Sequence, residues 1–579
     1  MGIDIIYPTA EFSWLIVAAF LAFIIQPGVA MVESGLSRSK NAADMMIRVY
    51  TNFGIIIILF WFLGFSVLFG RDITGLFGIP DIGASALTQG HVSRFDAVLF
   101  QTMLCAAAIA SFFGALAERT KFSVFCLCSV CMSLVIYPIV GHWIWGTGGW
   151  LAALGFHDFA GGAVLHVLSG TAAFIGCKMV GPRIGKYNLD GTVNAIRGHN
   201  LAVSIQGLFL LWLGWLGVAC GSFVLRHAEV SLGFVLQNLQ LAVAASIVTT
   251  LLVTWGRYGK PDVSMIINGG IAGIAAVSSG CDVISPAGAV CIGVLTGIVI
   301  VFSIEFVDKK MRADDPTGAI STHGICGALG CVLTGVFSLQ NGLAAGSSML
   351  IMTQIMGIVS IVVCVAVLCA VMFYGIDKVT GLRVSQVEEL AGLDFWEHGL
   401  AEVYSQEAPV LDPLADTALP DDRVPTLQGM KLGRKSEENS AVSVEEAVMV
   451  EHRPAQLKAG HKLTQITIIT SELRFEALKN ALEKIGITGM TVTRVLGFGI
   501  QKGHVDMYRG AQVKSRLLPK VKVELIVSAI SPQVIVNVAK KILYTGRYGD
   551  GKVFIYDVEN VVKIRTSEEG YDALQDYTI

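Results

Sequence analysis

Long apolar runs dominate the first two thirds of this 579-residue chain. Between residues 12 and 375, runs of about 20 apolar residues follow one another, and an α-helix of that length crosses a bilayer core of about 30 Å. Over the whole chain 53% of the residues are hydrophobic and only 15% are charged, whereas soluble domains carry about 25% charged residues. The sequence therefore predicts an α-helical membrane protein over this part.

We expect eleven transmembrane helices. Alternate loops each hold two or three basic residues, and the opposite loops hold only Arg71, Arg94 and Arg226. Because basic loops stay in the cytoplasm, the N-terminus is expected outside and the C-terminus in the cytoplasm. The first run has no basic segment before it and no cleavage-like end, which favours a true span over a signal peptide. The expected ranges are 11–33, 49–69, 95–117, 122–143, 160–180, 199–223, 233–255, 264–281, 285–307, 318–338 and 348–375.

Two stretches inside the apolar region share a polar pattern. Residues 158–166 read DFAGGAVLH and residues 315–323 read DPTGAISTH, so both fit D-x-x-G-x-x-x-x-H, and a glycine follows four residues later, at Gly170 and Gly327. The stretches fall in the fifth and tenth spans, which cross the membrane in opposite directions. The sequence thus predicts an inverted five-plus-five repeat with an eleventh helix added, and such repeats place the substrate path near the midplane at their interface.

The histidines of this pattern, His166 and His323, each lie ~12 Å along their helix at 1.5 Å per residue. We expect the two imidazoles to meet around the pseudo-twofold axis. A neutral imidazole offers one donor and one acceptor, so the pair can share a proton and line a path for a small polar solute. The alternative is that each histidine bonds a neighbouring backbone group, but the matched positions favour a pore. Asp158 either caps its helix or adds negative field at the outer mouth.

The rest of the chain divides into a linker and a soluble domain. Residues 1–404 form the expected membrane domain with its cytoplasmic C-terminal region, residues 405–459 carry scattered Pro, Ser and acidic residues typical of a linker, and residues 460–579 form the last domain. In that domain QITIIT and KVKVELIVSA alternate as strands do, and EALKNALEKIG and PQVIVNVAKKIL are amphipathic. The β-α-β, β-α-β order predicts an α+β ferredoxin-like fold.

Some classes of function find little support. We see no nucleophile with a base and no cluster of metal ligands, so neither catalytic residues nor a structural metal is expected. The twelve cysteines lie mostly singly in apolar helices and are interpreted as small core residues. The formal charge of −3 says little about partners, because two different solvents act on the two parts. No nucleic-acid partner is expected.

Residues 11–404 resemble the ammonium transporter family. The resemblance rests on GLSRSKNAAD, GALAER, HWIWGTGGW, DFAGGAVLH, RGHN, DDPTGAISTHGICGALG and GLRVSQVEELAGLDFWEHG. It implies a homotrimer with one pore per subunit, in which His166 and His323 are the twin pore histidines. It also implies an outer ammonium recruitment site of Trp145 and Ser222, where an aromatic face meets a cation, with Asp158 as its buried structural carboxylate.

The chain departs from this family at the outer gate. Two stacked phenylalanines usually close the outer pore, and Leu104 and Val218 stand at the matching positions here. Both side chains are smaller and not aromatic. We therefore expect either a leakier gate or a protein that does not conduct in the usual way.

Residues 463–579 resemble the PII signal-transduction family through GITGMTV, GFGIQKGH, MYRGA, LPKVKVE and TGRYGDGKVFIYDVENVVKIRT. The resemblance implies that a long hydrophilic segment with Tyr508 and Arg509 is the T-loop, which plugs partner proteins. It also implies binding of ATP or ADP between subunits of a trimer, and of 2-oxoglutarate with Mg²⁺-ATP near the base of the T-loop. The expected nucleotide-binding residues are Gly499, Gln501, Lys502, Gly549, Asp550, Gly551, Lys552, Lys563 and Arg565, and those for 2-oxoglutarate are Gln501 and Lys520.

Two positions differ from the PII pattern. Ile500 stands where the family has an arginine that faces phosphate, and Val513 stands where some members carry a uridylylated tyrosine. The turn TGRYGDGK can bring backbone N–H groups and Lys552 to phosphates, although alone it would be interpreted as an ordinary hairpin turn.

Together the two resemblances imply an ammonium channel or transporter of a bacterial cell (inner) membrane, gated by its own nucleotide- and 2-oxoglutarate-sensing domain. Since both families form trimers, one threefold axis can serve both parts, and the 55-residue linker keeps the regulator at high local concentration. The alternative is a non-conducting ammonium sensor that reports to the PII-like domain, and Leu104 and Val218 favour it.

Overall fold

The structure is a computed structural model, and its contacts divide the chain into two units that are described separately. The described residues are 9–80, 82–83, 95–188, 190–226, 228–400 and 462–574, the last range without 472–473, 488, 498–504, 509–510, 515–517 and 545–549.

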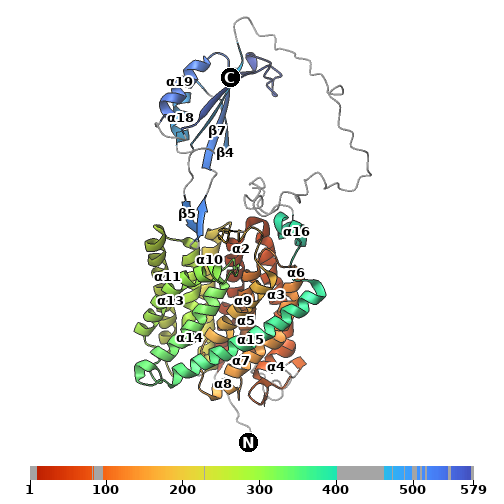
Figure 1. The fold of residues 1–579 in the computed structure, drawn as a ribbon, viewed down its shortest axis with the longest axis vertical. Helices are drawn as coiled ribbons and strands as arrows, with labels where there is room; N and C mark the ends of the chain where they lie inside the picture. Colours follow the sequence, from red (N-terminus) through yellow and green to blue (C-terminus); the bar gives the residue numbers. More distant parts are fainter. Residues whose placement is uncertain are drawn as a thin grey trace, which may run out of the picture. The chain divides into compact units, whose positions relative to one another are not determined.

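The first unit is a bundle of helices, drawn from red to green in Figure 1. Within the described residues of 9–400, two short strands, β1 (Asp72–Ile73) and β2 (Phe77–Gly78), pair with each other. The helices are α1 (Thr9–Phe23), α2 (Ile25–Leu36), α3 (Ala42–Leu59), α4 (Phe65–Phe69), α5 (Phe95–Phe113), α6 (Phe122–Cys131), α7 (Tyr137–Trp145), α8 (Trp150–Ala153), η7 (Gly162–Val167), α9 (Leu168–Val180), α10 (Leu201–Leu225), α11 (Leu232–Tyr258), α12 (Val263–Val277), α13 (Pro286–Lys309), η8 (Ile320–Ile325), α14 (Cys326–Phe337), α15 (Met349–Thr380), α16 (Gln386–Ala391) and α17 (Leu393–His398).

Ten helical segments of the described chain are long and apolar enough to span a membrane. The exception among the eleven expected spans is the eighth, because α12 has only 15 residues. At its C-terminal end, the carbonyl groups of Ser278 and Ser279 accept hydrogen bonds from the backbone N–H groups of Ala160 and Phe159. The loop that carries Asp158 therefore fills the space in which α12 would continue.

The eleventh expected helix, α15, joins the two halves of the bundle. It packs against α6 and α9 of the first half and against α14 of the second. Figure 1 shows it running obliquely along the outside of the bundle. After α15, the short helix α17 contacts α3, where the Asp394 carboxylate accepts hydrogen bonds from the backbone N–H groups of Ala43 and Asp44. The polar segment after the last span is thus anchored to the bundle.

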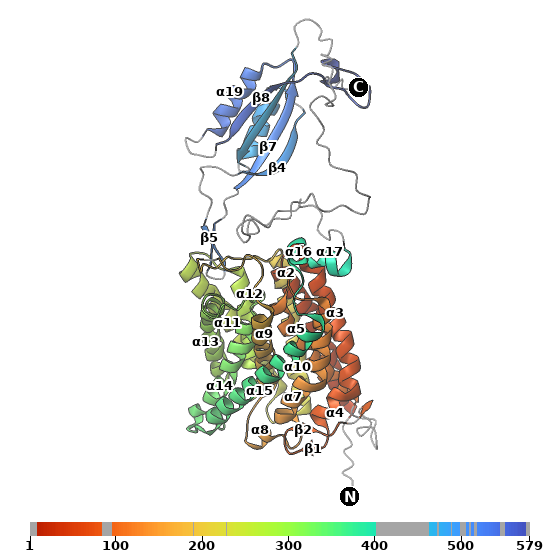
Figure 2. The same cartoon turned by 45° about the vertical axis from the view of Figure 1, so that its right-hand side comes forward.

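The second unit has the predicted βαββαβ order. Its four-stranded antiparallel sheet, seen in Figure 2, has the order β4-β7-β3-β8. The helices α18 and α19 lie on one side of it (Figure 1). Ile466, Val523, Leu478 and Ile535 form part of the core between sheet and helices. The elements are β3 (Thr464–Ser471), α18 (Phe475–Glu483), β4 (Thr491–Gly497), β5 (Val505–Tyr508), β6 (Ala511–Lys514), β7 (Leu518–Val527), α19 (Pro532–Leu543) and β8 (Lys552–Asp557). The ferredoxin-like prediction is confirmed.

The hydrophilic segment between the second and third strands of the sheet contains strands of its own. β5 and β6 pair with each other and with no strand of the four-stranded sheet among the described residues. Tyr508 ends β5 and Val513 lies in β6, whereas Arg509 lies outside the described residues.

Candidate functional site

The two aspartates of the repeated motif make matching hydrogen bonds. Asp158 Oδ1 accepts from the N–H of Gly161 at 3.0 Å, and Oδ2 accepts from that of Ala163 at 2.9 Å. Asp315 Oδ1 accepts from Gly318 at 2.8 Å and Oδ2 from Ile320 at 2.7 Å, again three and five residues onward. Both stretches therefore fold alike, as the repeat predicts. Asp158 also bonds Val164 N–H at 2.9 Å, so it caps its helix.

Each aspartate precedes a short π-helix that carries a histidine. Gly161 and Gly318 have φ values of 95° and 84°, a left-handed conformation that a residue with a Cβ rarely adopts. After these turns, η7 holds His166 and η8 holds His323. A π-helical turn re-aims side chains and is frequent at functional sites. Neither π-helix was predicted, because no sequence signal distinguishes it from an α-helix here.

The two histidines are in direct contact. His166 Nδ1 and His323 Nδ1 are 2.8 Å apart, and the imidazole planes are 7° from parallel. One Nδ1 donates and the other accepts, which requires complementary tautomers of the neutral rings. The Trp215 ring stacks on His166 with 4.6 Å between ring centres. The predicted contact is confirmed, and the alternative of bonds to backbone alone is excluded for this pair.

Glycines bring the two histidine helices together. A Cβ on Gly170 would lie 2.0 Å from the backbone nitrogen of Gly324, and one on Gly327 would lie 3.0 Å from Cβ of His166. Only a residue without a side chain fits at Gly170. The close approach sets the separation of the two imidazoles.

A cavity adjoins the histidine pair on the side of Asp315. His166, His323 and the Trp215 ring line it together with Glu33, Ser111 and Thr322, and the remaining lining is largely aliphatic. Neither Leu104 nor Val218 lines this cavity. Both are closed into the core, with 1% and 0% of their surface exposed.

At the other end of the bundle, one expected recruitment residue, Trp145, contacts Asp158. The Trp145 indole N–H donates to the backbone oxygen of Asp158 at 2.9 Å. Ser222 and Asp158 are buried. Burial raises the pKa of the Asp158 carboxyl, and its backbone hydrogen bonds and the nearby Arg226 charge oppose this effect. The structure therefore links Trp145 to the backbone of Asp158, while the Asp158 carboxylate bonds the start of its own helix.

Two residues near Trp145 and Ser222 were missed by the sequence analysis. The Arg226 guanidinium carbon lies 5.5 Å from the ring centre of Trp145. Arg226 follows Ser222 by four residues, and residues at that spacing lie on the same face of a helix. This spacing could have indicated that Arg226 lies near the expected recruitment site. The second residue is Phe100. A Cβ on Gly221, the neighbour of Ser222, would come 2.2 Å from the Phe100 ring, so this aromatic side chain packs beside Gly221.

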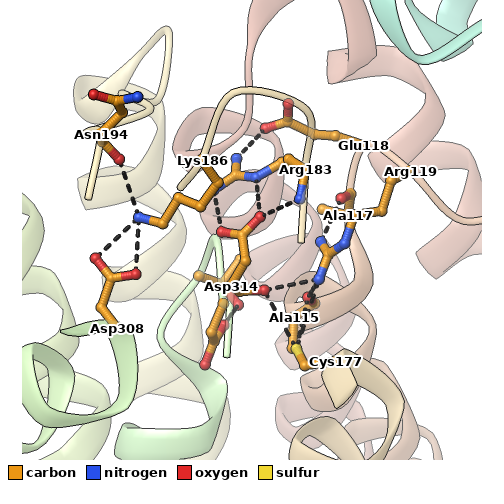
Figure 3. A network of polar contacts seen from close by, with 12 residues as sticks. Ala115, Ala117, Glu118, Arg119, Cys177, Arg183, Lys186, Asn194, Asp308 and Asp314 are labelled. Carbon is orange, nitrogen blue, oxygen red and sulfur yellow. Dashed lines mark hydrogen bonds and ion pairs between the residues drawn. The ribbon is translucent and has the colours of Figure 1, made fainter. Parts of the chain in front are cut away.

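A buried ion network holds Asp314, which directly precedes the motif residue Asp315 (Figure 3). Arg183 binds Asp314 in bidentate fashion, with both N···O distances at 2.8 Å, and its third nitrogen donates to Glu118 at 2.8 Å. Arg38 bonds the other oxygen of Glu118. Arg119 donates to the backbone oxygen of Asp314 at 2.7 Å. Segments far apart in sequence are therefore tied together at this end.

The network changes the acid strength of its carboxyls. Burial alone would raise the pKa of Glu118, but the Arg38 and Arg183 charges lower it to about 2. For Asp314 burial is likewise outweighed by Arg183, so its pKa lies well below the usual range. Both groups are charged at neutral pH, which makes the network a set of ion pairs.

In the second unit, part of the expected nucleotide site can be located. Asp550, Gly551 and Lys552 line a pocket with Lys540 and Leu543 of α19. Gly551 has a φ of 121°, which favours glycine. Lys520 in β7, Lys563 and Arg565 do not line this pocket. Gly499, Ile500, Gln501, Lys502 and Gly549 lie outside the described residues.

Comparison with known proteins agrees with this geometry. The model of the Ammonium Transporter Family matches residues 13–403, and that of nitrogen regulatory protein P-II matches residues 463–568. Ammonium transporter Amt2 of Archaeoglobus fulgidus is 37% identical over 410 residues, which cover 67% of this chain and 87% of the relative. A putative ammonium transporter of Synechocystis is 31% identical over 513 residues, covering 83% of this chain and 92% of the relative.

Solved structures give the same fold for the membrane unit. A protein described as Sensor Amt Protein superposes with a TM-score of 0.64 at 33% identity, over 67% of this chain and 98% of that one. Mep2 of Candida albicans, at 23% identity, has a TM-score of 0.61 over 73% of this chain and 96% of that one, which supports the fold alone. The chain is thus a multi-pass membrane protein that belongs to the Ammonium Transporter Family and carries a C-terminal P-II domain.

Proposed function

We propose that this chain conducts ammonium and that its own P-II domain controls the conduction. The observation that carries the proposal is the direct contact of His166 and His323 beside a cavity between the two repeat halves. Two neutral imidazoles in contact provide a donor and an acceptor on this path. The path starts from Trp145, Ser222 and Asp158, which we propose as the recruitment site for the cation.

The regulatory half of the proposal rests on the P-II domain. We propose that it binds ATP or ADP near Asp550, Gly551 and Lys552, and 2-oxoglutarate with Mg²⁺-ATP near Gln501 and Lys520. The T-loop with Tyr508 and Arg509 would then plug or leave the cytoplasmic mouth. We also propose a homotrimer in a bacterial inner membrane, with the N-terminus outside and the C-terminus in the cytoplasm.

A second candidate is a non-conducting ammonium sensor. Three observations favour it: non-aromatic Leu104 and Val218 replace the usual outer gate, Arg226 lies over Trp145, and a structure at 33% identity is described as a sensor. In that case ammonium binding would change the P-II domain without net transport.

The test is ammonium current in proteoliposomes. We would measure the full chain and a chain that ends at Tyr404, each with ADP and with Mg²⁺-ATP plus 2-oxoglutarate. The full chain should conduct less with ADP than with Mg²⁺-ATP plus 2-oxoglutarate, and the shortened chain should not respond. A ligand shifts the docking equilibrium only by its differential affinity for the two forms.

Two outcomes would contradict the proposal in different ways. Equal currents in all four conditions would remove the regulation. No current in any condition, with ammonium still altering nucleotide affinity, would establish the sensor, because coupling between two bound ligands is reciprocal.

A further inference from the structure

Glu33 has a carboxylate oxygen that the described fold leaves unsatisfied. The residue lies near the C-terminal end of α2 and is 3% exposed. Its Oε1 accepts the backbone N–H of Gly114 at 2.9 Å, whereas Oε2 has no hydrogen-bond partner in the described part of the chain. A buried carboxylate oxygen without a partner is costly. The molecule therefore has a reason to place a donor there.

The side chain lines the cavity beside the histidine pair. His166, His323 and Trp215 belong to the same lining. Arg48 is a cation whose charge acts on Glu33. It is, however, ion-paired with Asp44 at 2.7 Å and donates to the backbone oxygen of Thr120 at 2.9 Å. Both contacts use Nη2, and no Arg48 nitrogen donates to Glu33 in the described part of the chain, although Nε and Nη1 have no hydrogen-bond partner there.

Two hydroxyl groups of this cavity offer acceptors, because their own protons are donated elsewhere. Ser111 donates its hydroxyl proton to the backbone oxygen of Ala107 at 2.8 Å, and Thr322 donates to that of Gly318 at 2.9 Å. Each hydroxyl oxygen keeps lone pairs. The Trp215 indole N–H donates to Ser278 at 2.8 Å, so only the ring of Trp215 remains for the cavity. This part of the cavity suits a species that only donates.

We propose that Glu33 forms an inner binding site for ammonium, next to the histidine pair and on the Asp315 side. Ammonium has four N–H donors, no acceptor and one positive charge. Glu33 Oε2 would supply the countercharge, the hydroxyl oxygens of Ser111 and Thr322 would accept, and the Trp215 face would contact the cation. This inference rests on the proposed ammonium function and adds a binding residue that the repeated motif does not contain.

A purely structural role for Glu33 makes a different prediction. If its task were only to accept the Gly114 N–H, one oxygen would suffice and Glu33→Gln would keep it. The cation site needs the second, charged oxygen, which glutamine lacks. The amide variant therefore separates the two roles with little change in shape.

The test uses infrared difference spectra of the full chain in liposomes, together with ammonium current. Ammonium chloride is exchanged against potassium chloride, because potassium carries the charge but no N–H donors. Addition of ammonium to the wild type should change a carboxyl band that is missing in Glu33→Gln. Ammonium affinity should fall about tenfold or more in this variant, as expected for one lost charge-assisted hydrogen bond.

Glu305→Gln is the matched control. Glu305 is a buried carboxylate of α13 that pairs with Arg257 at 2.8 Å and does not line the cavity. This variant should keep the ammonium-dependent band. If Glu33→Gln fails to fold, Glu33→Asp retains the charge one methylene further away, and its band should shift and its affinity should fall.

The outcomes separate this site from the function on which it rests. An ammonium-dependent spectrum that is the same in Glu33→Gln and the wild type would overturn the inner site, whatever the current. A Glu33-dependent band without current in any variant would leave the inner site standing and remove conduction.

Discussion

Among single residues, Arg226 has the most direct consequence for ammonium binding. Its guanidinium carbon is 5.5 Å from the Trp145 ring centre, so a tethered cation already faces the ring that the recruitment site would use. Arg226→Gln should therefore raise ammonium affinity about two- to fivefold, as expected for a cation–π competitor of about 0.5–1 kcal/mol. The measurement is the ammonium concentration that gives a half-maximal response.

Arg71→Gln is the control for Arg226, because it removes the same charge from another connection between spans, where Arg71 lies just before β1. It should leave the affinity nearly unchanged. If both variants raise the affinity equally, the effect comes from the general field and not from Trp145.

Arg183 carries most of the ion network at the opposite end. Its loss leaves Asp314 and Glu118 charged and buried without their shared partner. Arg183→Gln should lower the free energy of unfolding by about 3–5 kcal/mol, as for other broken buried pairs. Arg257→Gln breaks a pair whose arginine side chain is 43% exposed, and it should cost about 0–1 kcal/mol. Thermal unfolding in detergent compares the two variants. Equal losses of stability would contradict the larger contribution assigned to the buried Arg183 network.

The same network predicts an acid limit of stability. The pKa of Glu118 is lowered from 4.5 to about 2 in the folded chain, so its stabilisation is complete above about pH 4.5. This contribution should be lost as the pH falls from about 4.5 towards 2, with Asp314 acting in the same direction. In Arg183→Gln the acid-dependent loss should be smaller, since part of the interaction is already gone. Thermal unfolding of the wild type and of Arg183→Gln over a series of pH values tests this prediction. The same dependence of stability on pH in both proteins would refute it.

At the scale of helices, Gly170 sets how closely η8 approaches α9. Gly170→Ala would place a methyl group 2.0 Å from the backbone nitrogen of Gly324, so the helices must separate. We expect a loss of about 1–3 kcal/mol from overpacking, together with a weaker ammonium response because the His166–His323 contact opens. Gly375→Ala in α15 meets no atom within 4 Å and serves as the control. A response unaffected in Gly170→Ala would show that the contact is dispensable.

The helical elements show which features of the structure could be predicted from the sequence alone. The repeated motif correctly predicted that the two aspartates fold alike and that the histidines meet, because matched spacing implies matched geometry. The π-helices and the short α12 were not predicted, since hydrophobicity reports burial but neither the local winding of a helix nor the residue at which it ends. Glu33 was also missed. Its proposed role arises from a cavity lined by α2, α5, η7, α10, α12 and η8, and no spacing along the chain encodes that meeting.

For the whole molecule, the proposed function requires the P-II domain to couple nucleotide binding to the membrane domain. Ile500 replaces an arginine that would face phosphate, and one charge-assisted hydrogen bond contributes about 1.5–3 kcal/mol. The full chain should thus bind ATP and ADP with similar affinities in calorimetry, and Ile500→Arg should restore a preference for ATP. A strong ATP preference in the unmodified chain would count against this interpretation.

Uridylylation is not expected at Val513, which has no hydroxyl group.

The matched hydrogen bonds of Asp158 and Asp315 have one further consequence. A pore made only of two such halves, turned against each other, would look the same to a solute arriving from either end. Such a pore would not distinguish between the two directions of transport. Any preference for one direction must therefore come from groups that have no counterpart in the other half. Arg226 beside Trp145 and Glu33 Oε2, which has no hydrogen-bond partner among the described residues, are two groups outside the repeated motif, one on each side of the histidine pair.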